Sequence, residues 1–149
     1  PLYYSYMKFI AILLLFLIPS RWETNFETAQ KAAKEKNQLI LLNFSGSDWC
    51  IPCIAMHRDY FDSPVFTEMA DKNLVMVNVD FPRKKKNEAA ADIVKRNEIL
   101  AEKYNKEGSF PLTLLLNSDG KVIKSWIGKP KISVEQWTQE IKTICDAQK

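Results

Sequence analysis

The chain has 149 residues, of which 46% are hydrophobic and 26% are charged, and its net charge is +3. These values are ordinary for a globular protein, and such a balanced charge argues against nucleic-acid binding. Three cysteines are an odd number, so a framework of structural disulfides is not expected. One close pair and one remaining thiol fit a redox pair with a bystander.

Residues 1–20 are predicted to be an export leader. Met7 and Lys8 give a short basic start, and residues 9–18 form an uncharged apolar run. Because a bilayer-spanning helix needs roughly twenty residues, this run fits a signal peptide better than a membrane helix. The alternative is a buried core helix. If residues 1–20 are a leader, residues 21–149 form one domain of ordinary size.

Helix and strand signals alternate along this domain, as the periodicity of the apolar residues indicates. In chain order, the sequence predicts a helix over 25–36, a strand over 38–44, a helix from 51 to about 61, a short helix over 63–70, a strand over 74–80, a helix over 88–104, strands over 112–116 and 121–126, and a helix over 133–147. Asn117 to Gly120 is a hairpin turn signal between the last two strands. Ser133 and Gln136 fit a capping box at the start of the last helix.

Cys50 and Cys53 lie at the junction between the first strand and the following helix. Their spacing lets the two sulfurs meet across one helical turn. At a helix N-terminus, free N–H groups and the helix dipole stabilise a thiolate, which is the form that attacks disulfides. A zinc site uses the same spacing but needs two further ligands, and only His57 lies at a helical spacing from Cys53. We expect His57 to be a surface or partly packed residue, and no metal to be bound.

Three separated motifs extend this interpretation: NFSGSDWCIPC at 43–53, VNVD at 77–80 and GSFPLTLLLNSDGKVIKSWIG at 108–128. With these motifs in this order, the chain resembles the thioredoxin-fold superfamily, and within it the exported bacterial thioredoxin-like thiol–disulfide oxidoreductases. The resemblance covers nearly all of residues 22–149. It implies an α/β thioredoxin fold in which helices flank a central mixed sheet of about four to five strands.

The resemblance also implies roles for the cysteines. Cys50 would be the exposed nucleophile that forms a mixed disulfide with the substrate, and Cys53, one turn deeper, would resolve it. Pro52 would stiffen the first turn, and Ile51 replaces the glycine of reducing thioredoxins. Oxidising and isomerising relatives carry a histidine where Pro52 stands, so its absence favours a reductase.

Phe110 and Pro111 match the cis-proline loop that faces the cysteines in such folds. We expect this loop to bind an extended substrate segment and Trp49 to pack beside the cysteines. Thioredoxins place a buried aspartate on the strand before the active site, whereas this chain has Asn43 at the matching position. Asp48 could partly substitute for that acid, or it could cap a turn.

Two further features are less specific. Arg83 to Lys86 form a basic run, which is either a solvated loop or a site that steers acidic partners. Cys145 falls near the apolar stripe of the last helix, where we expect a buried structural thiol.

The function indicated is an exported, periplasmic thiol–disulfide oxidoreductase that reduces protein disulfides, with the Cys50–Cys53 disulfide as its redox group and no other cofactor. It would act as a monomer on disulfide-containing proteins, receive electrons from an unidentified redox protein, and meet the membrane only through an uncleaved leader. One alternative is a disulfide isomerase or oxidase with the same cysteines. Another is a non-catalytic, redox-gated binding module that uses the groove near Phe110 and Pro111.

Overall fold

The computed structural model describes residues 22–149, so the predicted leader lies outside the described residues. In chain order the elements are α1 (Phe26–Lys36), β1 (Leu39–Ser45), α2 (Ile51–Met56), the π-helical turn η1 (His57–Phe61), α3 (Pro64–Asn73), β2 (Leu74–Asp80), the 3-10 turn η2 (Lys85–Asn87), α4 (Ala91–Tyr104), β3 (Leu112–Leu116), β4 (Val122–Ile127) and α5 (Val134–Ala147). Every predicted helix and strand is present, with ends that move by at most three residues.

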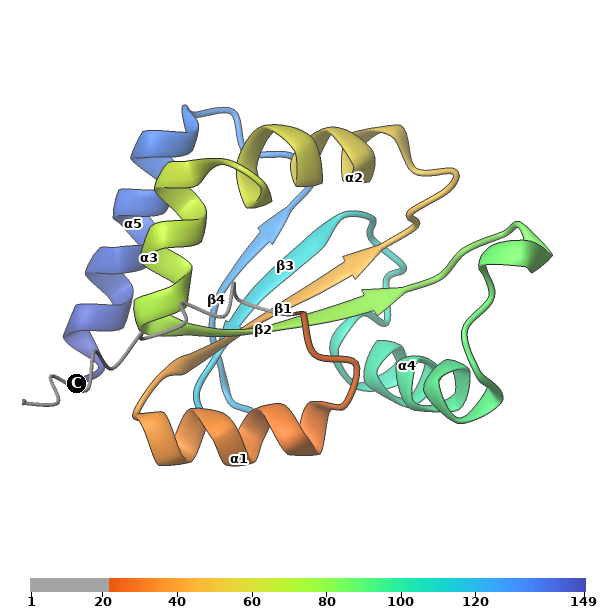
Figure 1. Ribbon diagram of the computed structural model, residues 1–149, viewed down its shortest axis with the longest axis horizontal. Coiled ribbons are helices and arrows are strands. Elements are labelled where there is room, and N and C mark those ends of the chain that lie inside the picture. Colours follow the sequence, from red (N-terminus) through yellow and green to blue (C-terminus); the bar gives the residue numbers. More distant parts are fainter. Residues whose placement is uncertain (1–21) are drawn as a thin grey trace, which may run out of the picture.

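The four strands form one sheet in the order β2-β1-β3-β4. β1 is parallel to β2 and antiparallel to β3, and β3 is antiparallel to β4. Helices α2, α3 and α5 cover one face of the sheet, and α1 and α4 cover the other (Figure 1). This arrangement confirms the predicted thioredoxin fold, and its mixed sheet has a strand number within the predicted range.

Alternation along β1 divides the core into two layers. Leu39 and Leu41 face α3 and α5, whereas Ile40 and Leu42 face α1 and α4. All seven β1 residues are buried, as a strand covered by helices on both faces requires. Trp137 of α5 is fully buried in the first layer, where its ring contacts four other aromatic rings.

Local signals set most of the element ends. The capping box of Ser133 and Gln136 is formed at the start of α5. α3 runs three residues beyond its predicted end because the buried Asn73 continues it, donating from Nδ2 to the Met69 carbonyl at 2.8 Å. α4 begins three residues later than predicted, at Ala91, because Glu88 ends the 3-10 turn η2 in an extended conformation and Ala90 is also non-helical.

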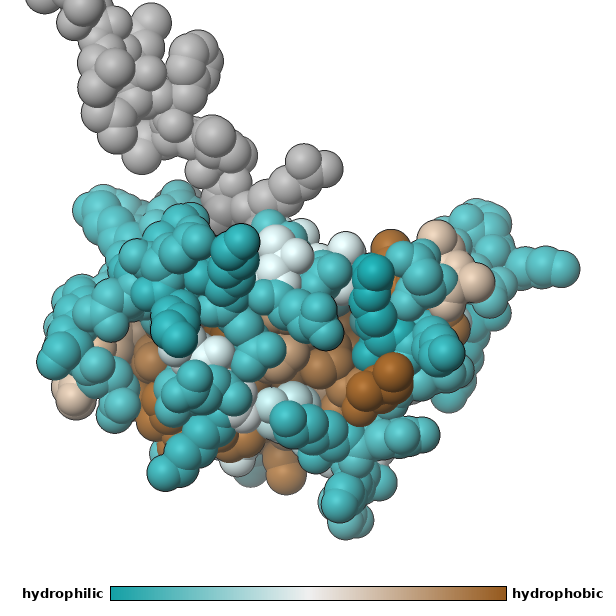
Figure 2. Space-filling model, turned by 90° about the horizontal axis from the view of Figure 1, so that it is seen from below, coloured by the Kyte–Doolittle hydropathy of each residue, from teal (hydrophilic) through white to brown (hydrophobic). Residues whose placement is uncertain are grey.

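The face that α1 and α4 cover is seen from below in Figure 2. Hydrophilic side chains cover most of it, and hydrophobic side chains show between them. Between the two helices, Phe26, Ile99 and Leu100 line a small cavity of about 210 Å³. Within residues 22–149, no helix combines the length and the apolar character that crossing a membrane requires.

Candidate active site

Cys50 and Cys53 form a disulfide at the start of α2. Cys50 is the N-cap residue of the helix, and its Sγ accepts the backbone N–H of Cys53 at 3.3 Å. Pro52 lies in the first helical turn, where a backbone N–H has no partner within the helix. The sequence pattern therefore places both thiols where the helix N-terminus favours a thiolate once the disulfide is opened.

The expectation that Cys50 is exposed is wrong for this disulfide form. Cys50 is only 4% exposed and Cys53 is fully buried. The Cys50 sulfur is bonded to Cys53 and receives its N–H, and the Cys50 N–H donates to the Gly46 carbonyl at 2.8 Å. These contacts turn the residue inward, whereas the neighbouring Ile51 is 78% exposed.

The loop of Phe110 and Pro111 lies beside the cysteine segment. The peptide bond between these two residues is cis, the isomer that the resemblance implied. The Phe110 ring lies 5.5 Å from the Trp49 ring, edge to face, which brings the loop next to the residue that precedes Cys50. The Pro111 carbonyl accepts the Gly128 N–H at 2.8 Å, so the end of β4 supports the loop.

Trp49 is fixed by contacts with Phe81, Arg83 and Gly46, none of which the sequence predicted. Its indole Nε1 donates to the Phe81 carbonyl at 2.7 Å, and the Arg83 guanidinium lies 3.9 Å from its ring centre. Its backbone N–H donates to the Gly46 carbonyl, so a tight turn folds the indole back over Gly46. A glycine three residues before a tryptophan was the only available signal for this close approach.

Gly46→Ala should displace the Trp49 indole, because a Cβ at this position would lie 2.3 Å from Trp49 Cε2. We expect a cost of about 1–3 kcal/mol in the free energy of unfolding, the usual range for overpacking. Urea denaturation and tryptophan fluorescence measure the two effects.

A double-mutant cycle tests the cause. In the Trp49→Ala background the clash is gone, so Gly46→Ala should then cost much less. An equal cost in both backgrounds would mean that the indole is not what excludes a side chain at Gly46.

Asp48 binds the loop that follows β2. Its carboxylate accepts the backbone N–H groups of Arg83 and Lys84 and the Nδ2 of Asn87, each at 2.9 Å. These hydrogen bonds, led by that of Arg83, lower the pKa of Asp48 to about 2. Of the two roles predicted for Asp48, the contacts match the capping of a turn.

The hydrogen bonds that the Asp48 carboxylate accepts from Arg83, Lys84 and Asn87, here called the clamp at Asp48, should depend on pH in a defined direction. Because the folded pKa lies below the ordinary value, the clamp is complete above about pH 4 and is lost as pH falls through about 2. Asp48→Asn should therefore make the Arg83 and Lys84 amides exchange roughly tenfold faster near neutral pH. Residue-resolved hydrogen exchange measures this, with Asp119→Asn in the exposed hairpin turn as the matched control. Unchanged protection of both amides in Asp48→Asn would contradict the clamp.

A polar row crosses the sheet on the face that α2 covers. Asn43 of β1 pairs in register with Asn78 of β2 and Thr113 of β3. Asn43 is 1% exposed and donates from Nδ2 to Thr113 Oγ1 at 3.0 Å. The Oδ1 atoms of Asn43 and Asn78 and the Ser45 hydroxyl are buried with no hydrogen-bond partner among residues 22–149. Asn43 therefore lies on the strand before the active site, and its amide is buried among polar side chains.

His57 lies at the end of this region. It lines a cavity of about 340 Å³ together with Ser45, Asn78 and Asp62. Burial lowers the pKa of His57, and the charges of Asp62 and Asp80 oppose that shift. Within the described part of the chain, no group of three or more His, Cys, Asp or Glu residues is placed to hold a metal ion.

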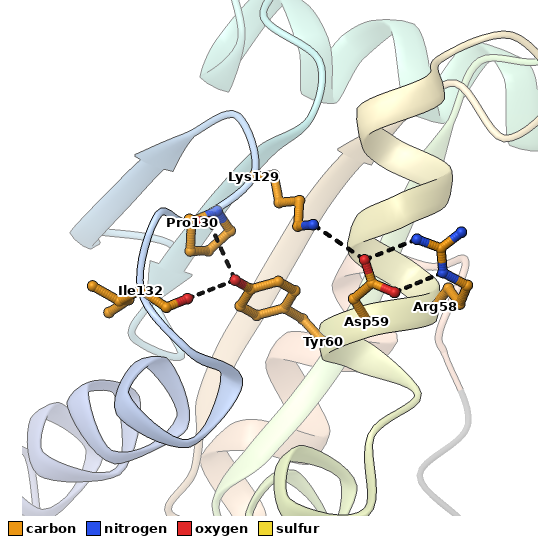
Figure 3. A network of polar contacts seen from close by, with 6 residues as sticks. All are labelled: Arg58, Asp59, Tyr60, Lys129, Pro130 and Ile132. Atoms are coloured by element: carbon orange, nitrogen blue, oxygen red, sulfur yellow. Dashed lines mark hydrogen bonds and ion pairs between the residues drawn. The ribbon is translucent and has the colours of Figure 1, made fainter.

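The π-helical turn after α2 ties the cysteine-bearing helix to the segment after β4 (Figure 3). Asp59 accepts hydrogen bonds from Arg58 and from Lys129 Nζ, the latter at 3.1 Å, and the Tyr60 hydroxyl lies 2.6 Å from the Ile132 carbonyl. Because Lys129 follows Gly128, which binds Pro111, these contacts link the helix to the cis-proline loop. These contacts therefore hold the cysteine-bearing helix and the cis-proline loop together.

Cys145 stands apart from this site. It is 3% exposed, and burial, with a smaller contribution from Asp146, raises the pKa of its thiol to about 11. It is therefore protonated at neutral pH and unreactive, which agrees with the prediction of a buried structural thiol.

A thioredoxin fold with a CxxC disulfide at the start of α2 and a cis-proline loop beside it defines the class of thiol–disulfide oxidoreductases. This chain belongs to the thioredoxin-like family, which it matches over residues 21–118.

Individual relatives agree with this assignment. Disulfide bond reductase DsbH of Chlamydia pneumoniae is 36% identical over 101 residues, which are 68% of this chain and 58% of that protein. Thioredoxin-related protein DsbJ of the same organism is 28% identical over 102 residues, or 68% of this chain and 28% of that protein. The chain thus spans less than two thirds of the length of both curated relatives.

Solved structures give the same result. The structure of a DsbH oxidoreductase superposes with a TM-score of 0.75 at 29% identity and covers 86% of this chain and 85% of that one. A thioredoxin from Thermus thermophilus has a TM-score of 0.63 at 14% identity, covering 86% and 88% of the two chains, and supports the fold alone.

Proposed function

We propose that this chain is an exported reductase of protein disulfides. The observation that carries the proposal is the Cys50–Cys53 pair at the helix N-terminus, with Pro52 and no histidine between the cysteines. A relative described as a disulfide bond reductase supports the same direction. The predicted leader supports a periplasmic location, where substrate disulfides persist.

The reaction proceeds by two thiol–disulfide exchanges. The Cys50 thiolate attacks one sulfur of the substrate disulfide, forms a mixed disulfide and releases the other sulfur as a thiolate. Cys53 then attacks the Cys50 sulfur, so the second substrate thiol leaves and the Cys50–Cys53 disulfide forms. Two electrons have passed from the dithiol to the substrate, and a dithiol redox protein must return them for the next cycle.

The surroundings of Cys50 supply the substrate site. Phe110 and Pro111 present backbone to which an extended substrate segment can align, and Trp49 limits access of water. Ile51 at 78% exposure and Ile127 at 76% offer apolar contacts, the latter in register with Leu112 beside the loop.

Reduction of insulin by dithiothreitol tests the proposal. Wild-type protein should accelerate the reaction, and Cys50→Ser should abolish the acceleration. A wild-type rate equal to that of Cys50→Ser would instead favour a redox-gated binding module. Efficient reshuffling of a scrambled disulfide protein, without net reduction of insulin, would favour an isomerase.

A further inference from the structure

The basic loop after β2 lies against the active site. β1 and β2 are parallel, so their carboxyl ends meet at one edge of the sheet, where the segments after both strands extend (Figure 1). Ser47 closes this edge by donating its backbone N–H to the Asp80 carboxylate at 2.8 Å and its hydroxyl at 2.5 Å. The loop that begins after Asp80 is therefore next to the turn that leads into Cys50.

Two contacts dock this loop on the cysteine segment. The Asp48 carboxylate receives two backbone N–H groups of the loop, and Trp49 donates its indole N–H to the Phe81 carbonyl. Both residues directly precede Cys50. The Arg83 guanidinium adds a side-chain contact, since it lies 3.9 Å from the centre of the Trp49 ring. The side chains of residues 83–86 are nevertheless all exposed to solvent.

Residues 83–86 carry four positive charges. Arg83, Lys84, Lys85 and Lys86 are all exposed, and none of them lies within ion-pair distance of a carboxylate in residues 22–149. Of the three acids nearby, Asp48 and Asp80 are occupied by N–H and O–H donors at the base of the loop. Glu88 is exposed and remains as the only unengaged acid in the segment 80–88.

A cavity of about 270 Å³ lies behind this surface, between the loop and α4. Its lining includes the cations of the loop, Arg83, Lys84 and Lys85, and also the carboxylates of Asp80 and Glu88. The exposed cationic side chains at its rim, rather than the cavity itself, are therefore the groups that an acidic side chain would meet.

We propose that this surface, the exposed basic residues 83–86 beside the cysteine segment, selects protein substrates or partners that carry acidic residues next to their disulfide. The inference rests on the proposed reductase function. The occupant is a polypeptide, because the surface adjoins the disulfide and the net charge of the chain is only +3, which is low for nucleic-acid binding. Charges at the rim of an interface act chiefly on the association rate, so the effect belongs in kcat/KM.

Two synthetic peptides test the proposal. Each contains the same intramolecular disulfide, flanked by four glutamates in one and by four lysines in the other, and an uncharged small disulfide serves as the reference substrate. At low ionic strength the kcat/KM for the acidic peptide should exceed that for the basic peptide roughly tenfold or more, and salt should reduce the ratio. Lys84→Glu/Lys85→Glu/Lys86→Glu should invert the preference.

The matched control is Lys31→Glu/Lys34→Glu/Lys36→Glu, which makes the same charge change on exposed positions of α1 and should retain the preference. Equal kcat/KM for the two peptides, or the same response in both triple variants, would overturn the proposal. Failure to reduce even the uncharged disulfide would instead overturn the reductase function on which it rests.

Discussion

Replacing Cys53 with alanine is expected to lower the turnover of disulfide substrates by at least about 1,000-fold while leaving Cys50 able to attack. The resolving step is intramolecular, and a neighbouring thiol acts at an effective concentration that no thiol in solution matches. The variant should therefore accumulate the mixed disulfide between Cys50 and substrate. Mass spectrometry under non-reducing conditions detects this adduct.

Cys145→Ala provides the control for this experiment. Its thiol is buried and protonated, so its removal should leave turnover unchanged and yield no adduct. Turnover by Cys53→Ala close to that of wild type, or an adduct on Cys145, would contradict the assignment of the two active cysteines.

Replacing Asn43 with aspartate should cost about 4 kcal/mol of unfolding free energy at pH 7. The side chain is 1% exposed, and burial of this degree raises the pKa of a carboxyl by about three units. Each unit corresponds to 1.36 kcal/mol between the protonated and ionised forms, which gives about 4 kcal/mol in total. Thr113 Oγ1 is the one hydrogen-bonding group in contact with Asn43 Nδ2, and it would only partly compensate.

The sign of this effect gives a sharp pH test. Because the folded pKa is raised, the variant should be nearly as stable as wild type below about pH 4 and should lose stability as pH rises through the folded pKa. Urea denaturation at pH 4 and pH 7 measures the difference. Gln139→Glu on the exposed face of α5, the same change from amide to acid, should shift stability by less than about 0.5 kcal/mol at either pH. Equal stability of Asn43→Asp and wild type at pH 7 would show that water reaches the side chain at position 43.

Local signals made the fold predictable. The capping box of Ser133, the turn over Asn117 to Gly120 and the apolar run of β1 each depend on residues within one element or one turn. Cys50 and Cys53 were found in the same way, since their spacing and their place before a helix are both local. The resemblance then supplied Phe110 and Pro111, which lie far from the cysteines in sequence.

The remaining features of the site depend on contacts between distant segments. The contact of Asp48 with Arg83 and Lys84 joins residues about 35 positions apart. The contacts of Trp49 with Phe81 and Gly46 likewise follow from how two strand ends meet. Cys50 was expected to be exposed because a nucleophile must meet its substrate, whereas the disulfide form holds its sulfur inward.

The contacts of Asp48 also fix the position of the basic loop, which its composition did not establish. A run of four cations is usually a solvated surface, and these four side chains are indeed exposed. Their position is what differs, because Asp48 and Trp49 hold the loop beside Cys50. The same contacts that order the loop therefore place its charge beside the Cys50–Cys53 pair, where the proposed substrate would bind.

The reduction potential of the Cys50–Cys53 pair is the most direct test of the proposed direction of the reaction. Equilibration with reduced and oxidised glutathione at pH 7, followed by quantification of the two protein forms, measures it. We expect a potential toward the roughly −270 mV of thioredoxin, because Pro52 stands where oxidising relatives carry a histidine. A value near the roughly −120 mV of strong oxidants would contradict a reductase.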